Sequence, residues 1–271
     1  FIMKKITLLL LSIFILSSCE DWKPEKLTID WGDKPQPLYE AVTMKPLPGK
    51  ETDLIEKLKE YNSMYHNKAE DTSAFLRYIS SGNDSGKYMW IEGPMDFKYV
   101  NERNNLEGRS NYWRKNILPL IVDSKTNFYR HGLPLSVFSK KEITPQAYRV
   151  IGFKLFNDNG YEWEKVNNIM YKFKLAEDAV ETGYSKHIFY PYEKVPGDSD
   201  FYVVFPMKSL AEEDNSDKNE NGINDWEELM GKMNEMFGNM DLIWKEWDSL
   251  VYRNESHTRI VVKWKIEFPH I

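Results

Sequence analysis

Cysteine is almost absent from this chain, since Cys19 is the only one among 271 residues. A single cysteine cannot close an intramolecular disulfide, so the folded part must be held together by its core. The common nucleophile motifs are also missing, because no GxSxG stretch occurs and no second thiol is present. The five histidines show no metal-binding spacing such as HxxxH. These absences argue against a disulfide scaffold and against the common hydrolases.

An excess of positive charge is absent too. The chain has 36 Lys and Arg against 42 Asp and Glu, which gives a formal net charge of −6. This balance argues against nucleic acid as a partner and against electrostatic attraction to anionic lipid. The longest apolar run, residues 6–16, is too short to span a bilayer comfortably. Aromatic residues, by contrast, make up 14% of the chain, which is typical of a globular protein with a large core.

The first residues have the pattern of a bacterial export signal. Lys4 and Lys5 precede the apolar run, and the run ends in LSSC at 16–19. This ending resembles the lipobox of bacterial lipoproteins, in which the cysteine receives a diacylglycerol thioether. We therefore expect a signal peptide at 1–18, lipid on Cys19 and a membrane anchor in the cell envelope, with the outer membrane favoured. The alternative is an ordinary secretory peptide in which Cys19 is incidental.

Strands and helices are expected to alternate after a proline-containing tether at 19–37. In the segment 38–140, the pattern predicts strands at 38–46, 73–82, 87–93 and 126–132, and helices at 49–67 and within 94–121. In the segment 141–271, it predicts strands at 147–156, 184–192, 200–207 and 258–268, and helices at 161–182 and 223–251. The order β-α-β-β-α-β therefore occurs twice.

Two tandem β-α-β-β-α-β units predict an α+β fold built from two ferredoxin-like repeats. Each repeat would place its helices on one face of an antiparallel sheet, so the other face of each sheet needs a cover. We expect the two sheets to pack face to face as a fused, pseudo-symmetric α+β barrel. Neither half should then fold well alone.

Two stretches of the first half, "KPLPGKETDLIEKLKEYNSMYH" (45–66) and "GKYMWIEGPMDF" (86–97), carry a family resemblance. They resemble the dimeric α+β barrel superfamily, with its antibiotic-biosynthesis-monooxygenase-like and stress-responsive barrel domains, over about residues 38–130. The resemblance implies cofactor-free monooxygenases, haem-degrading enzymes and peroxidase-like relatives. A haem site requires an iron ligand such as histidine. Of the five histidines, only His131 and His187 lie on predicted strands, and neither lies in a recognisable motif.

Alternation along the strands predicts which side chains face the barrel interior. We expect a ligand-binding cavity lined by Tyr88, Trp90 and Glu92 from one strand, by Asn127, Tyr129 and His131 from another, and by Arg259, Val261, Lys263 and Lys265 from the last. Met89 and Ile91 would then face the helices. Such a cavity could bind a small amphipathic molecule. The alternative is that the aromatic side chains fill the barrel and the charges lie at its open ends.

The stretch "DKNENGINDWEE" (217–228) matches an EF-hand-type calcium loop, with Gly222 at the sharp turn. The predicted ligands are Asp217, Asn219, Asn221, the carbonyl of Ile223, Asp225 and Glu228. Asn219 and Asn221 replace aspartates, which weakens the charge of the site. The alternative is that Asp225 and Glu228 form a capping box at the start of a helix. The two interpretations are compatible, and we expect any bound calcium to be structural.

The sequence favours a lipid-anchored, extracytoplasmic binding or accessory protein that holds a small ligand between two sheets. A small-molecule oxygenase that uses the same interior is the alternative. A purely structural surface lipoprotein is a third reading.

Overall fold

The computed structural model describes residues 27–66, 73–104, 108–140, 144–181, 183–209 and 225–263. The first half contains β1 (Leu38–Pro46), α2 (Glu51–Tyr65), β2 (Ala74–Ile79), β3 (Tyr88–Met95), α3 (Phe97–Asn104), α4 (Arg109–Tyr112), η1 (Trp113–Ile117), η2 (Leu118–Leu120) and β4 (Ile121–His131). The second half contains η3 (Leu133–Leu135), β5 (Ala147–Leu155), α5 (Gly160–Val180), β6 (His187–Pro191), β7 (Phe201–Met207), α6 (Asp225–Phe237), α7 (Met240–Leu250), β8 (Val251–Arg253), η5 (Glu255–His257) and β9 (Arg259–Lys263). The described strands and helices follow the predicted order, except that the helix predicted at 223–251 is two helices and a short extra strand, β8, precedes the last one.

The helices form where apolar residues recur at helical spacing and where a side chain can cap the first turn. In α2, Leu54, Leu58 and Tyr61 lie on one face and are buried against the sheet. At the start of α5, the Asn159 side chain accepts a hydrogen bond from the backbone N–H of Glu162 at 3.0 Å. These local signals place each helix along one face of the sheet.

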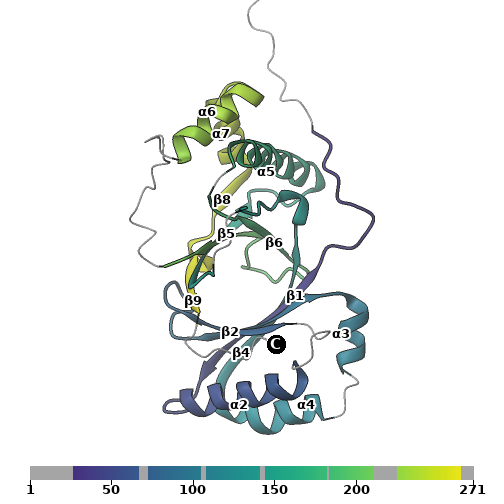
Figure 1. Cartoon of the computed structure of the whole chain (residues 1–271), viewed down its shortest axis with the longest axis vertical. Helices are drawn as coiled ribbons and strands as arrows, with labels where there is room; N and C mark the ends of the chain where they lie inside the picture. The colour runs from purple at the N-terminus through teal and green to yellow at the C-terminus, as the bar shows by residue number, and fades with distance from the viewer. Residues whose placement is uncertain are drawn as a thin grey trace, which may run out of the picture.

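The strands form one antiparallel sheet that closes on itself (Figure 1). Its order is β7-β6-β4-β1-β3-β2-β9-β5-β8, and β7 also pairs with β5. Two pairings join the halves of the chain, β4 with β6 and β2 with β9. The strands β8 and β9 both pair with β5, so together they form one strand position in the sheet, interrupted at 254–258.

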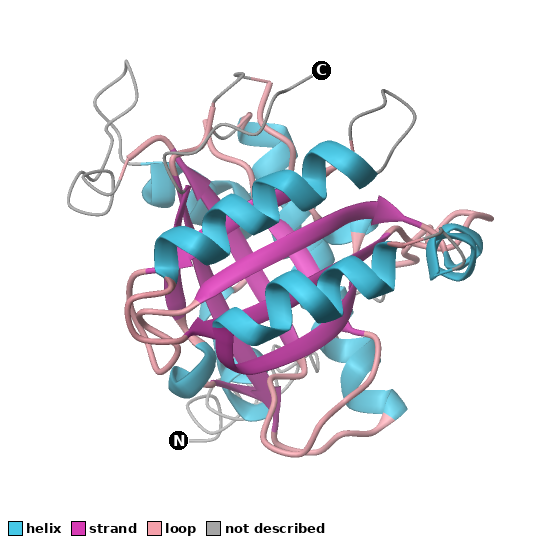
Figure 2. Ribbon diagram, turned by 90° about the horizontal axis from the view of Figure 1, so that it is seen from below, coloured by secondary structure: helices cyan, strands magenta, loops and turns pink. Residues whose placement is uncertain are grey.

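Helices cover the outside of the closed sheet at opposite ends of the view in Figure 1, with α2 and α4 on one side and α5, α6 and α7 on the other. Figure 2 looks from the side of α2 and shows helices lying across the strands. Each helical layer has its own apolar core, one around Leu58 and Trp90 and the other around Ile169 and Phe201. The helices therefore cover the outer face of the sheet, and closure of the sheet covers its inner face. Within the described residues, no helix combines the length and apolar character that crossing a membrane requires.

Candidate functional site

A cavity of about 290 Å³ lies inside the barrel. Its wall consists of Tyr39, Ala41, Phe75, Arg77, Met89, Ile91, Tyr129, Tyr148, Val150, His187, Phe189, Tyr202, Val204, Arg259 and Val261. Because side chains alternate along a strand, each strand sends every second residue into this cavity and the intervening residues towards the helices. The volume is at the lower end of the range for ligand pockets, which begins at about 300 Å³. The barrel interior is thus a mostly apolar space of small-molecule size.

The charge of Arg77 is largely accommodated by its own neighbours. Its Nη1 donates to the carbonyl oxygen of Leu76 at 3.1 Å, and its guanidinium lies 5.2 Å from the ring centre of Phe75 and 5.3 Å from that of Tyr148. Cations are attracted to the faces of aromatic rings at such distances. Arg77 is therefore a lining residue whose contacts lie mainly within the wall itself.

Two other polar groups in the wall have an atom without a partner. Arg259 pairs with Asp84, with its Nη1 3.0 Å from Oδ2, but its buried Nε has no hydrogen-bond partner among the described residues. The buried Nδ1 of His187 also has no hydrogen-bond partner among the residues that the structure describes. Buried polar atoms in proteins are nearly always hydrogen-bonded, so each of these two atoms requires an explanation.

His187 lines the cavity, and His131, which does not line it, lies beside His187 with ring centres 5.2 Å apart. The His131 ring stacks on Phe189 at 4.7 Å, and its Nε2 lies 3.2 Å from the Oγ of Ser136. Since that hydroxyl already donates to the carbonyl oxygen of Gly132, the Nε2 of His131 must donate to it. Burial, and to a lesser extent His187, lowers the pKa of His131 to about 4, and burial also lowers the pKa of His187. Both imidazoles are neutral at pH 7.

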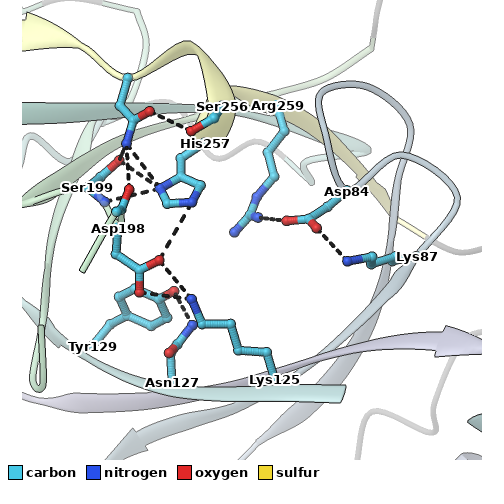
Figure 3. Close-up of polar contacts among 12 residues, drawn as sticks. Asp84, Lys87, Lys125, Asn127, Tyr129, Asp198, Ser199, Ser256, His257 and Arg259 are labelled. Atoms are coloured by element: carbon cyan, nitrogen blue, oxygen red, sulfur yellow. Dashed lines mark hydrogen bonds and ion pairs between the residues drawn. The ribbon is translucent and has the colours of Figure 1, made fainter. Parts of the chain in front are cut away.

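A smaller polar cavity of about 100 Å³ adjoins the apolar one and shares Tyr129, Tyr202 and Arg259 with it. Figure 3 shows the charged groups around it, which we call the polar mouth: Asp84, Lys87, Lys125, Asp198, His257 and Arg259. The cations and carboxylates of this mouth are paired with one another. The Nζ of Lys125 lies 2.7 and 2.9 Å from the two carboxylate oxygens of Asp198.

Asp84 connects two cations of the polar mouth. Its Oδ1 accepts from Lys87 at 2.7 Å and its Oδ2 from Arg259 at 3.0 Å (Figure 3). Partial burial would raise the pKa of the Asp84 carboxyl, but Lys87 and Arg259 together hold it below its usual value. Asp84 therefore stays ionised and compensates most of the charge that Arg259 brings to the cavity.

Ser199, His257 and Asp198 lie in the order of a hydrolase triad, but their geometry is structural (Figure 3). The backbone N–H of Ser199 donates to the Nδ1 of His257 at 3.1 Å, so that nitrogen is occupied. Ser199 is fully buried, and its Oγ accepts from the Nδ2 of Asn254 at 3.1 Å. The backbone of β5 also packs closely against this Oγ, because a Cβ added to Gly152 would lie only 2.3 Å from it. The hydroxyl thus holds the break in the last strand and is closed to a substrate.

A second cavity, also about 290 Å³, lies on the helix side of the first half. Its wall consists of Glu40, Val42, Tyr61, Trp90, Arg103, Arg109, Ser110, Trp113, Arg114, Leu118 and Thr126. A buried ion network, which we call the Glu92 network, borders it and consists of Glu92, Glu40, Arg103 and Arg109. Glu92 is fully buried and binds Arg103 and the Nη2 of Arg109, the latter at 2.8 Å, while Arg103 also reaches Glu40 at 2.7 Å.

The pKa values of this network reflect burial first. Burial, with Glu92 nearby, raises the pKa of Glu40 against the opposing effect of Arg103. Burial raises the pKa of the Tyr61 hydroxyl to about 12, and that hydroxyl accepts from the Nε of Arg109 at 2.6 Å. Burial works against the charge of Arg109, but Glu92 outweighs it and raises the pKa of Arg109. Arg109 is therefore charged at every ordinary pH.

The structure corrects the predicted faces of β3. Tyr88 and Trp90 pack in the core beneath α2, and Glu92 belongs to the helix-side network, so none of the three lies in the barrel cavity. Met89 and Ile91 line that cavity instead. The prediction was wrong because this strand is apolar or aromatic on both faces, and both faces are covered, so alternation alone could not orient it.

On β4 and β9 the prediction is met in part. Tyr129, Arg259 and Val261 line the barrel cavity, whereas Asn127 lines the adjoining polar cavity and His131 contacts the lining residue Phe189 without lining the cavity itself. Lys263 ends β9, and Lys265 lies outside the described residues. Sequence reasoning missed Arg77, although its position in "FLRYI" alternates with two apolar residues that face the helices.

The predicted lipidation site and most of the predicted calcium loop lie outside the described residues. This applies to Cys19 and to Asp217, Asn219, Asn221 and Ile223. Asp225 begins α6, and Glu228 lies in its first turn. Among the described residues, no group of three or more His, Cys, Asp or Glu side chains is arranged to hold a metal ion.

Haem, which the family resemblance implies, does not fit the barrel cavity. His187 offers a ring nitrogen without a partner in the described structure, so a ligand to iron is present in kind. The cavity is too small for haem, however, because a porphyrin with its side chains is larger than about 290 Å³. The neighbouring imidazole of His131 is stacked on Phe189, and its Nε2 is hydrogen-bonded to Ser136, so that nitrogen would not be available to iron. The chemistry of this interior must therefore be argued from its own side chains.

No protein-family model and no curated protein matches this sequence. The fold is similar to that of an arginine-to-alanine variant of chlorite dismutase from Candidatus Nitrospira defluvii, with a TM-score of 0.51 and 9% identity over 85% of this chain and 92% of that one. A proposed monooxygenase from Lactobacillus acidophilus NCFM gives a TM-score of 0.49 and 11% identity over 84% and 94% of the two chains. A proposed monooxygenase from Fusobacterium nucleatum gives 0.49 and 12% over 85% and 94%.

Identities this low show the fold alone. The similarity supports a mixed α+β fold with a large antiparallel sheet.

Proposed function

We propose that this protein binds a small, mostly apolar molecule inside its barrel. The observation that carries the proposal is that two buried atoms in the wall of a mostly apolar cavity, the Nε of Arg259 and the Nδ1 of His187, have no hydrogen-bond partner in the described part of the chain. A ligand oxygen would satisfy Arg259, because a guanidinium N–H can only donate. His187 is neutral and can donate or accept, depending on its tautomer. The ligand class is therefore an apolar molecule that ends in a carboxylate or another oxygen acceptor.

The charge of the cavity supports a carboxylate at that position. Arg77 and Arg259 bring two positive charges to the wall, and the carboxylate beside Arg259, Asp84, is shared with Lys87. The positive charge of the wall therefore exceeds the negative charge paired with it, which favours an anionic group on the ligand. Met89, Ile91 and Val261 provide an aliphatic surface for the rest of the molecule.

We further propose that the two halves are ferredoxin-like repeats that form a fused, pseudo-symmetric barrel. Numbering the strands of each half in order, the first half runs 4-1-3-2 as β4-β1-β3-β2, and the second runs the same way as β9-β5-β7-β6. The halves meet where the fourth strand of one pairs with the second of the other, at both seams. This correspondence supports a repeat. The barrel cavity would then lie between the two repeats.

Calorimetry with decanoate as the probe tests the barrel site. We expect decanoate to bind the full chain and decanol to bind more weakly, because only the carboxylate pairs with Arg259. Arg259→Met should weaken decanoate binding about tenfold, the cost of losing one hydrogen bond to a charged group. Arg253→Met is the matched control, since Arg253 lies on β8, does not line the cavity, and has the surface residue Glu255 and Thr258 as its partners. Equal affinities for decanoate in wild type and Arg259→Met would contradict the proposal.

An oxygenase is the second candidate function. It is supported by the resemblance of residues 45–66 and 86–97 to monooxygenase-like domains, and by the neutral His187 in the cavity wall, which could accept a proton. The test first extracts any small molecule that co-purifies with the protein. Consumption of dissolved oxygen is then measured with that molecule added to the wild-type protein and to the His187→Ala variant. Oxygen consumption that depends on His187 supports the enzyme. Binding without oxygen consumption leaves the binding protein as the function.

We also propose that lipid on Cys19 anchors the protein in the cell envelope. The support is the order of lysines, apolar run and LSSC at 16–19. Cys19→Ser should move the protein from the membrane to the soluble fraction and abolish lipid labelling, whereas Ser17→Ala should do neither. A Cys19→Ser protein that stays in the membrane and still carries lipid would contradict lipidation at Cys19.

A structural calcium site at 217–228 completes the proposal. It is supported by the six-position match, Asp217 to Glu228, and by the place of the last two predicted ligands. Asp225 and Glu228 lie in the first turn of α6, and calcium loops of this type end at the start of a helix.

A further inference from the structure

The helix-side cavity of the first half contains a buried cation with a donor left over. Arg109 is only 6% exposed, its Nε donates to Tyr61, its Nη2 donates to Glu92, and its guanidinium also hydrogen-bonds Tyr99. Its buried Nη1 has no hydrogen-bond partner among the described residues. A guanidinium carries donors on all three nitrogens, so one side of Arg109 remains to be satisfied. An acceptor in the adjoining cavity would satisfy it.

The charge around this cavity favours an anion as that acceptor. Glu92 and Glu40 balance Arg103 and Arg109 within the buried network. Arg114 also lines the cavity, and its Nη2 donates to an amide oxygen, the Oδ1 of Asn111, at 3.3 Å. The cavity wall thus carries one positive charge more than its carboxylates compensate. A single negative charge would restore the balance.

The remaining wall is aromatic. The ring of Trp113 lies 5.4 Å from that of Trp90 and 5.1 Å from that of Tyr61, and all three residues line the cavity. Flat rings favour another flat ring through edge and offset contacts, which contribute about 0.5–1.5 kcal/mol beyond burial of area. The volume, about 290 Å³, suits a small molecule with one ring.

We propose that this helix-side cavity is a second binding site, for a small aromatic carboxylate. The carboxylate binds the Nη1 of Arg109 and the guanidinium of Arg114, and the ring lies against Trp113 and Trp90. The site is separate from the barrel interior, because the two cavities share no lining residue. They lie on opposite faces of the same strands, as β3 sends Met89 to one and Trp90 to the other. The proposal is therefore independent of the barrel ligand.

The test uses benzoate as the probe and benzyl alcohol as its neutral counterpart, measured by calorimetry with the full chain. We expect benzoate to bind saturably and benzyl alcohol to bind at least several-fold more weakly. Arg114→Gln should weaken benzoate about fivefold, the effect of an exposed ion pair near 1 kcal/mol. Lys115→Gln should leave it unchanged, since the exposed Lys115 is the next residue along but does not line the cavity.

Two further variants locate the probe. Thr126→Trp places a large ring in the helix-side cavity from the exposed position Thr126 and should abolish benzoate binding while the far-ultraviolet circular dichroism stays native. Arg259→Met removes a cation from the barrel cavity and should leave benzoate binding unchanged. Three results would each overturn the proposal: no saturable binding of benzoate, equal binding of benzyl alcohol, or loss of binding in Arg259→Met. Failure of decanoate to bind would count against the barrel site only.

Discussion

At the scale of single residues, the most consequential group is the fully buried Glu92. It lies on β3 and receives Arg103 from α3 and Arg109 from α4. A buried charge is tolerated only when it is paired and hydrogen-bonded, so this carboxylate fixes where both helices lie on the sheet. The same contacts orient Arg109 towards the helix-side cavity. One residue thereby links the packing of the first half to its proposed second site.

Glu92→Gln should lower the free energy of unfolding by about 3–5 kcal/mol, because it leaves two buried guanidinium groups without their shared counter-ion. Urea denaturation measures the change. The matched control is Glu102→Gln, whose pair with Lys98 is exposed, and it should stay within about 0.5 kcal/mol of wild type. A loss below about 1 kcal/mol for Glu92→Gln would mean that the buried pairs are not needed to hold these helices.

His131 should make the fold acid-sensitive. Burial lowers its pKa to about 4 in the folded protein, against an ordinary value of 6.5, so the unfolded chain binds the proton more tightly. The contribution is fully present above about pH 6.5 and is lost as the pH falls towards 4, by about 3 kcal/mol in total. His131→Phe keeps a ring against Phe189 but cannot titrate. The drop in free energy of unfolding between pH 7 and pH 4 should be smaller in this variant than in wild type, and equal drops would contradict the assignment.

At the scale of elements, local pattern predicted which segments are strands and helices, but not always which way they face. Helical spacing of Leu54, Leu58 and Tyr61 was enough for α2, because one face of that helix is polar. Alternation was not enough for β3, where Met89 and Trp90 are both apolar and both buried. A strand covered on both faces carries no polar face that would mark the outside. The break between β8 and β9 likewise depends on the hydrogen bond between Ser199 and Asn254, which are far apart in sequence.

The start of α6 allows the calcium and capping interpretations to be separated. Calcium at a hundredfold above its Kd would add about 2.7 kcal/mol to the free energy of unfolding and raise the melting temperature by a few degrees. Glu228→Gln removes the expected bidentate ligand but keeps a residue that can cap. The calcium-dependent shift should therefore disappear in this variant while its melting temperature in chelator hardly changes. Identical wild-type melting curves in chelator and in millimolar calcium would leave only the helix start.

At the scale of the whole molecule, closure of the sheet creates the barrel cavity. Two seams complete it, β4 with β6 and β2 with β9, and each joins one half of the chain to the other. Arg77 and Met89 come from the first half, whereas His187 and Arg259 come from the second. The proposed ligand site therefore exists only when both halves are in place.

A fragment of residues 38–140 should not be a stable soluble monomer. Its sheet would expose the face that the second half covers, including Phe75 and Ile91, and an apolar patch of that kind drives association. Size-exclusion chromatography with light scattering should find a homodimer or aggregate. A folded monomer would show that the first half needs no cover.

The sequence by itself determined the order of strands and helices, the mixed α+β class and the lack of a disulfide framework, because these depend on the spacing of nearby residues. It also predicted that Tyr129, Arg259 and Val261 share the interior, since one polar residue beside apolar ones sets the phase of a strand. Only the tertiary structure decided the rest. Arg77, His187 and Arg259 line one cavity although they come from three different strands, and Glu92 faces the helices with Arg109. Such contacts depend on how distant strands pair and on which face a second layer covers, and neither is encoded in the periodicity of a single segment.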